Sequence, residues 1–198
     1  MKKGVFIEKD GTLLVDVPYN VDPAFIQFND TVPEALSLLQ DEGYELIIVS
    51  SQPGIALNYF TAKEMSIMEE VIRQRLEESG IDLAGFYYCP HHPHGKNRIY
   101  SRSCGCRKPQ PGLILQAAEE LHIDLEESWM IGDVLHNVEA GNRANCKTIF
   151  LDNGNEVEWD INEWRKPTHI VQTLAEAASY ICSANRKPSR MFAPQVRA

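Results

Sequence analysis

Several short motifs in the sequence combine carboxylates, hydroxyls and a lysine, which are the groups that handle phosphate esters. Glu8 and Asp10 follow one apolar run, Ser50 ends a second, Asp133 follows a third, and Lys108 lies in a loop between them. In doubly wound parallel sheets, ligands bind beyond the carboxyl ends of the strands. We therefore expect these five side chains to meet at one edge of a sheet. Phosphoryl transfer depends mostly on positioning and on neutralising charge over three oxygens, and this set suits it.

Each of these groups has a role in such chemistry. The carboxylates of Glu8 and Asp133, with the carbonyl of Asp10, would hold Mg²⁺, which prefers a few hard oxygen ligands. Lys108 would add a fixed positive charge, and Ser50 would donate to phosphate oxygens. Asp10 lies two residues beyond Glu8, where it would protonate a leaving alkoxide and then activate water. Further substrate contacts are expected from Ser51, Gln52 and Arg107.

A second group of residues has the spacing of a metal site. Two short pairs, Cys89-x-His91 and Cys104-x-Cys106, supply three thiolates and one imidazole. That is a closed tetrahedral set for a structural Zn²⁺. His92 and His94 are neighbouring alternatives to His91 and are otherwise interpreted as loop or pocket residues. The bound metal would stiffen a loop that lacks a core of its own and would aim Arg107 at the substrate.

Strand-length apolar runs alternate with longer helical patterns, which predicts a doubly wound parallel α/β sheet. The predicted strands are Gly4–Ile7, Glu45–Val49, Phe86–Cys89, Trp129–Ile131 and Thr148–Leu151, with an edge strand at Ile170–Val171. The predicted helices are Val32–Leu39, Met65–Leu76, Leu113–Leu121, Val138–Ala144 and Leu174–Ile181. The loop from Cys89 to about Pro111 is rich in His, Pro and Gly, and its length indicates a function.

Length and charge narrow the class of protein. With 198 residues and 43% hydrophobic residues, the chain suits one well-packed domain over 1–184, followed by a basic tail over 185–198. A net charge of −9 argues against a nucleic-acid surface, since phosphate backbones are held mainly by Lys and Arg. No apolar run reaches the roughly 20 residues of a membrane helix. We expect a cytoplasmic protein without nucleic-acid or membrane partners, and the oligomeric state stays open.

Several residues outside the motifs are interpreted as structural. Cys146 and Cys182 lie on apolar patterns and are expected to fill the core. Trp159 and Trp164 stand in a polar segment, and we favour a core role for them over a contact surface. The tail carries Arg186, Lys187, Arg190 and Arg197 with no acid, and we interpret it as a loosely docked terminus.

The order of the motifs resembles the haloacid dehalogenase-like phosphatases. That family has a strand ending in Asp-x-Asp-Gly-Thr, a second ending in Ser or Thr, then a Lys, then Gly-Asp. The matching residues here are Glu8 to Thr12, Ser50, Lys108 and Gly132-Asp133. The segments Cys89-Pro-His91-His92 and Cys104-Gly-Cys106-Arg107-Lys108-Pro109 resemble the zinc-loop branch of heptose bisphosphate and histidinol phosphatases. The resemblance implies an essentially capless fold and Mg²⁺-dependent hydrolysis of a small phosphorylated sugar.

Four positions depart from the family pattern. Glu8 stands where the family has the nucleophilic Asp, and Asn137 stands where another acid is frequent. Ser51 and Pro53 replace the Asn and Ser that are usual in this branch. The added methylene of Glu8 moves the carboxylate by roughly an ångström, a displacement that can cost about 10² in rate. The sequence leaves two functions open: a phosphatase of weakened activity, with histidinol phosphate as the alternative substrate, or an inactive relative that binds a sugar phosphate or a partner protein.

Overall fold

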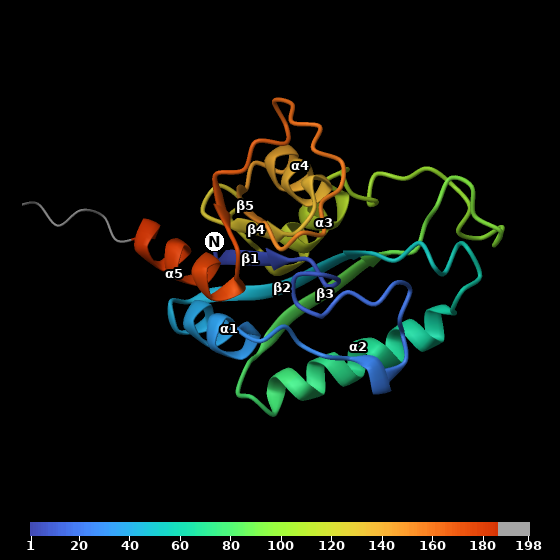
Figure 1. Cartoon of the computed structure of the whole chain (residues 1–198), viewed down its shortest axis with the longest axis horizontal. Helices are drawn as coiled ribbons and strands as arrows, with labels where there is room; N and C mark the ends of the chain where they lie inside the picture. The colour runs from blue at the N-terminus through green and yellow to red at the C-terminus, as the bar shows by residue number, and fades with distance from the viewer. Residues whose placement is uncertain (186–198) are drawn as a thin grey trace, which may run out of the picture.

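The computed structural model describes residues 1–185 and contains one six-stranded parallel sheet flanked by helices (Figure 1). Its strands are β1 Lys3–Ile7, β2 Tyr44–Ser51, β3 Leu83–Cys89, β4 Trp129–Gly132, β5 Lys147–Leu151 and β6 His169–Val171. Its helices are α1 Val32–Asp41, α2 Ala62–Glu77, α3 Gly112–Leu121, α4 Leu135–Arg143 and α5 Leu174–Asn185, with a short 3₁₀ turn at Pro23–Phe25. The predicted fold class is therefore confirmed.

The strand order β3-β2-β1-β4-β5-β6 reverses direction at β1, because the chain adds β2 on one side and returns to add β4 on the other. All five strand pairs are parallel, so the carboxyl ends of the six strands share one edge. A reversal of strand order opens a crevice at that edge, where such sheets bind their ligands. The first and fourth strands border this crevice, and each is followed at once by an acid, Glu8 and Asp133.

Alternation along β1 divides the core between the two faces of the sheet. Val5 and Ile7 belong to the larger core, under α1, α2 and α5, whereas Phe6 belongs to the smaller core, under α3 and α4. Figure 1 shows α1, α2 and α5 on one side of the sheet and α3 and α4 on the other. Side chains of successive strand residues point to opposite faces, and burial on both faces produces a continuous apolar run.

Helix ends follow local signals. Helix α2 begins after a complete capping box, in which Thr61 and Glu64 satisfy each other's backbone N–H groups. Helix α4 begins at Leu135, three residues before the predicted start at Val138. The reason is distant in sequence: Glu156 accepts a hydrogen bond from the backbone N–H of Leu135 at 2.5 Å and so caps the helix.

The two tryptophans of the late polar segment do not lie in the core. Trp159 is 55% exposed and Trp164 is 42% exposed, so the core interpretation is wrong for both. Their rings lie on the surface of the segment between β5 and β6, where Trp159 meets Phe150 edge-on and Trp164 stacks under Arg143. Cys146 and Cys182 are buried, as predicted.

No helix among residues 1–185 is long and apolar enough to cross a membrane. The predicted tail over 185–198 lies outside the described residues from Arg186 onward.

Candidate active site and metal centre

A cleft of about 260 Å³ opens at the carboxyl edge of the sheet, beside β1 and β4. It is lined by acids, bases and amides, namely Glu8, Asp10, Asp16, Ser51, Arg107, Lys108, Asp133, His136, Asn137 and Asn155. The structure therefore brings together predicted residues that lie more than a hundred positions apart in the chain. Ser50 and Gln52 lie just behind the cleft, where they contact its acids.

Glu8 is held from two sides. Its Oε1 accepts a hydrogen bond from Ser50 Oγ at 2.9 Å, and its Oε2 contacts the ammonium group of Lys108. Lys108 is buried and also donates to the carbonyl oxygen of Val49 at 3.1 Å. Burial lowers the pKa of Lys108 to about 7, while the charge of Asp133 opposes this shift. The contact with Glu8 also favours the ammonium form, so the buried lysine stands beside an acid that stabilises its charge.

Asp10 is fixed by two donors as well. Its Oδ1 pairs with the ammonium of Lys9, and its Oδ2 accepts from Gln52 Nε2 at 2.8 Å. Gln52 Nε2 also donates to Ser50 Oγ at 2.9 Å, which links Asp10 to Glu8 through one chain of hydrogen bonds. Lys9 was not predicted as part of the site. In the sequence, Lys9 stands between the acids Glu8 and Asp10. In the structure its side chain is only 1% exposed, and a buried lysine needs a counter-ion.

Asp133 accepts hydrogen bonds from two different parts of the chain. Thr12 Oγ1 donates to Oδ1 at 3.1 Å, and Asn155 Nδ2 donates to Oδ2 at 2.8 Å. Burial raises the pKa of Asp133, and the hydrogen bonds from Asn155 and Thr12 act against that rise. Asn155 is a second residue that sequence reasoning missed, because it lies in a polar loop with no motif.

The turn after β1 must be glycine at position 11. Gly11 has φ +75°, and an added Cβ would stand 1.9 Å from Asp133 Oδ2 and 2.6 Å from Asn155 Nδ2. A side chain at this position would meet both the backbone strain of a left-handed conformation and a collision with the acid. The glycine of the motif thus lets the β1 loop approach Asp133.

The donor set of the cleft fits Mg²⁺. Glu8 and Asp133 offer hard carboxylate oxygens and Asp10 a carbonyl oxygen at one place, as a site that retains several waters requires. Two further buried groups at the cleft, Ser51 Oγ and both amide atoms of Asn137, have no hydrogen-bond partner within the protein. Buried polar atoms need partners, so these groups are suited to a bound ligand or its water shell.

Besides Asn155, two titratable lining residues were not predicted from the sequence. Asp16 comes from the loop after β1, and its pKa is raised by burial and by the nearby charge of Asp10. His136 comes from the first turn of α4, and burial, with a contribution from Arg165, lowers its pKa. An imidazole and a further carboxyl group thus line the cleft beside the predicted residues.

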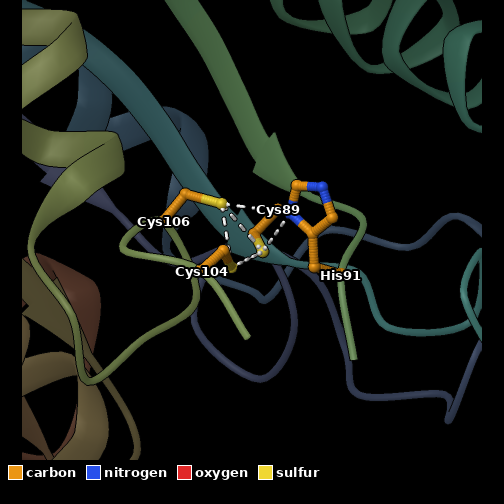
Figure 2. A group of neighbouring side chains, drawn as sticks. All are labelled: Cys89, His91, Cys104 and Cys106. Carbon is orange, nitrogen blue, oxygen red and sulfur yellow. Dashed lines mark hydrogen bonds between the residues drawn. The ribbon is translucent and has the colours of Figure 1, made fainter. Parts of the chain in front are cut away.

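The predicted zinc ligands form a cluster. Their ligand atoms all lie within 4.8 Å of one another, and Figure 2 shows the four side chains of Cys89, His91, Cys104 and Cys106 pointing to a common centre. The three sulfur–sulfur distances are 3.2, 3.2 and 3.5 Å, and His91 Nδ1 lies 3.3 Å from the Cys106 sulfur. A tetrahedron with Zn–S bonds of about 2.3 Å has sulfurs roughly 3.8 Å apart, so a small outward movement accommodates the ion.

His91 completes this cluster, whereas His92 and His94 do not belong to it. The His92 ring instead accepts a hydrogen bond from the backbone of His94. The loop that carries the cluster is joined to α3, because the backbone N–H of Gly112 donates to the Gly105 carbonyl at 2.9 Å. Arg107, directly after the last ligand, lines the cleft as the sequence suggested.

Comparison with known proteins identifies the family. Residues 105–177 match the Hydrolase_like family model, described as HAD-hyrolase-like. The D-glycero-beta-D-manno-heptose-1,7-bisphosphate 7-phosphatase of Pasteurella multocida is 38% identical over 182 residues, which cover 91% of this chain and 97% of the relative. The enzyme of the same name from Escherichia coli K12 is 39% identical over 147 residues, covering 74% of this chain and 77% of the relative.

Solved structures agree on the fold. A putative HAD-like phosphatase from Mesorhizobium loti superposes with a TM-score of 0.80 at 25% identity, covering 95% of this chain and 90% of that chain. The D,D-heptose 1,7-bisphosphate phosphatase of B. bronchiseptica gives a TM-score of 0.79 at 22% identity, covering 92% of this chain and 99% of that chain. The chain therefore belongs to the haloacid dehalogenase-like phosphatases, in the family of the D-glycero-beta-D-manno-heptose-1,7-bisphosphate 7-phosphatases.

Proposed function

We propose that this chain is a Mg²⁺-dependent phosphatase-type domain for a small sugar bisphosphate of the heptose 1,7-bisphosphate type. The observation that carries this proposal is the convergence of Glu8, Asp10, Lys108 and Asp133 on one cleft at the strand-order reversal. Relatives of nearly full coverage named as heptose bisphosphate 7-phosphatases support the substrate class. Histidinol phosphate is the alternative substrate.

The residues of the cleft divide the work as follows. Lys108 and Arg107 attract the phosphates, and Ser51 offers an unpaired hydroxyl to a phosphoryl oxygen. Glu8 occupies the position of the attacking carboxylate, and Lys9 and Gln52 hold Asp10 where it would give a proton to the leaving alkoxide and later take one from water. Mg²⁺, held by Glu8, Asp10 and Asp133, would offset the repulsion between these acids and the phosphate.

Zinc is assigned a structural role in this proposal. Three thiolates and an imidazole close the coordination shell and leave no position for a reacting water. The ion would hold the loop that presents Arg107 and Lys108, two residues that follow the last ligand directly. Metal-binding cysteines that form no disulfide also suit a reducing compartment, so we assign the protein to the cytoplasm.

We further propose that turnover is weak. Both Glu8 oxygens are already engaged, by Ser50 and by Lys108, and the extra methylene displaces the carboxylate from the position of an aspartate. In-line attack needs the nucleophile about 3–3.5 Å from phosphorus and aligned with the leaving group. The same contacts favour the second candidate function, a relative that binds a sugar phosphate, or a partner protein, without hydrolysing it.

The substitution Glu8→Asp separates the two candidates. We expect wild-type protein to hydrolyse heptose bisphosphate slowly or undetectably in the presence of Mg²⁺, and Glu8→Asp to raise the rate by at least about 10². The measurement is phosphate release over a panel of monoesters that includes histidinol phosphate. Vigorous hydrolysis by wild type that falls in Glu8→Asp would refute the weakened nucleophile. Binding of the bisphosphate without turnover in either protein would favour the binding function.

A further inference from the structure

A turn after β5 contacts three segments at the cleft: the loop after β1, the end of β4 and the start of α4. Asn153 Nδ2 donates to the carbonyl oxygen of Gly11 at 2.7 Å, and Asn155 Nδ2 donates to Asp133 Oδ2 at 2.8 Å. Glu156 caps the first turn of α4 through Leu135. The turn is internally braced, because Asn153 Oδ1 accepts from the backbone N–H of Asn155 at 3.2 Å.

We propose that Asn155 is a positioning residue that orients Asp133 toward the cation site. The inference rests on the proposed Mg²⁺ site, and it adds a residue from outside the four sequence motifs. Asn155 lines the cleft itself, so its amide lies at the boundary between the acid and the place where a ligand must sit.

The contact geometry argues for orientation rather than for simple packing. Asp133 is 4% exposed, so each of its oxygens needs a donor or a cation. Thr12 holds Oδ1, and Asn155 is the donor to Oδ2. Without the amide, Oδ2 would be a buried acceptor that has lost its donor, so rotation of the side chain toward another donor would be favoured. Together the two donors restrict the carboxylate to one rotamer.

The close approach of Gly11 strengthens the assignment. An added Cβ at Gly11 would strike both Asp133 Oδ2 and Asn155 Nδ2, which places the two groups side by side against the β1 loop. Groups that hold a metal ligand in place orient it toward the ion, and their loss typically costs about 10- to 100-fold in metal binding.

A matched control comes from the residue that anchors the other end of the segment between β5 and β6. Asn142, on α4, donates through Nδ2 to the carbonyls of Trp164 at 2.8 Å and Lys166 at 3.0 Å. It anchors the segment between β5 and β6 but is absent from the cleft lining. Asn142→Ala therefore loosens the segment without removing a contact to Asp133.

The first experiment is calorimetric titration of the zinc-loaded full chain with Mg²⁺. We expect Asn155→Ala to raise the dissociation constant at least about 10-fold, Asn142→Ala to change it less than about 2-fold, and Asp133→Asn to abolish binding. An unchanged affinity in Asn155→Ala, or an equal loss in Asn142→Ala, would overturn the proposal. The second result would mean that the order of the segment, and not the amide, sets the affinity.

A second experiment, without Mg²⁺, tests the inference even if wild type does not bind this ion. Failure to bind Mg²⁺ would count against the proposed function and not against the positioning role. Crystal structures of zinc-loaded, Mg²⁺-free wild type, Asn142→Ala and Asn155→Ala would be compared at the Asp133 side chain. We expect one rotamer in wild type and in Asn142→Ala, and two or more in Asn155→Ala. A single unchanged rotamer in Asn155→Ala would overturn the positioning role.

Discussion

At the scale of single residues, the site is a set of acids that hydrogen bonds and ion pairs within the protein hold in place. Each of the three acids Glu8, Asp10 and Asp133 has two protein donors, and two of the acids are paired with a lysine. Such mutual pairing keeps the carboxylates together without a cation, because an unpaired buried acid would otherwise be costly. An incoming anion must therefore interact with lysines that are already in ion pairs.

Lys108 gives this arrangement a pH dependence. Burial lowers its pKa to about 7 although the charge of Asp133 opposes this shift, so raising the pH removes the charge of Lys108 within an accessible range. Sulfate serves as the test anion, because it remains a dianion throughout this range. Its affinity for the cleft should fall about 10-fold between pH 6 and pH 9, because the charge-assisted hydrogen bond from Lys108 is lost. Lys108→Arg, which keeps its charge, should bind sulfate almost equally across this range. A flat titration in wild type would show that the lysine stays charged or does not contact the anion. The pKa of His136 is lowered from its ordinary value, so His136 does not add a second transition above pH 7.

At the scale of elements, the zinc cluster and the start of α3 form one unit. Gly112 permits this contact, since a Cβ there would stand 2.3 Å from the Gly105 carbonyl oxygen. The loop after β3 buries little apolar surface of its own, so its order depends on the ligand cluster. Zinc binding would thus be part of the folding free energy of this loop.

Removing one ligand tests that dependence. Cys104→Ser should lower the zinc content from about one ion per chain to near zero and reduce the free energy of unfolding by at least about 2 kcal/mol. Hydrogen exchange should accelerate over residues 90–111 while β1 and β4 stay protected, because the strands have their own core. Cys146→Ala, at a buried cysteine outside the cluster, is the control and should retain zinc. Full zinc content in Cys104→Ser would contradict the ligand assignment.

At the scale of the whole molecule, one sheet carries a core on each face. The strands belong to both cores at once, since neighbouring residues of β1 point to opposite sides. Loss of either helical layer would therefore expose one face of strands whose other face packs against the remaining layer. This coupling is the physical basis for the prediction of a single domain over 1–184.

Equilibrium unfolding in urea measures that coupling. Trp129 is buried in β4, whereas Trp159 and Trp164 are exposed, so a Trp159→Phe/Trp164→Phe variant reports on the sheet centre alone. In zinc-loaded protein we expect the fluorescence of Trp129 and the far-ultraviolet circular dichroism to follow one transition with the same midpoint. Two separated midpoints would indicate two folding units and contradict the single domain.

The sequence by itself determined the class of fold and the types of residue at the site. Apolar periodicity is a local property, so the runs at Gly4–Ile7 and Trp129–Ile131 predicted their strands with errors of one residue at the ends. The motif residues could be placed together because parallel strands bring their carboxyl ends to one edge. The Cys/His cluster was equally readable, since two close pairs with metal-ligand chemistry require little knowledge of the rest of the chain.

The tertiary structure alone decided which partners these groups have. Lys9 forms an ion pair with Asp10. Asn155 donates a hydrogen bond to Asp133 from a loop whose composition predicts no site. Trp159 and Trp164 lie on the surface although their residue type favours burial. Such outcomes depend on which loop covers which strand end, and that is fixed by contacts between distant segments. Hydrophobic periodicity indicates which face of a strand or helix is buried, but it carries no information about contacts between distant segments.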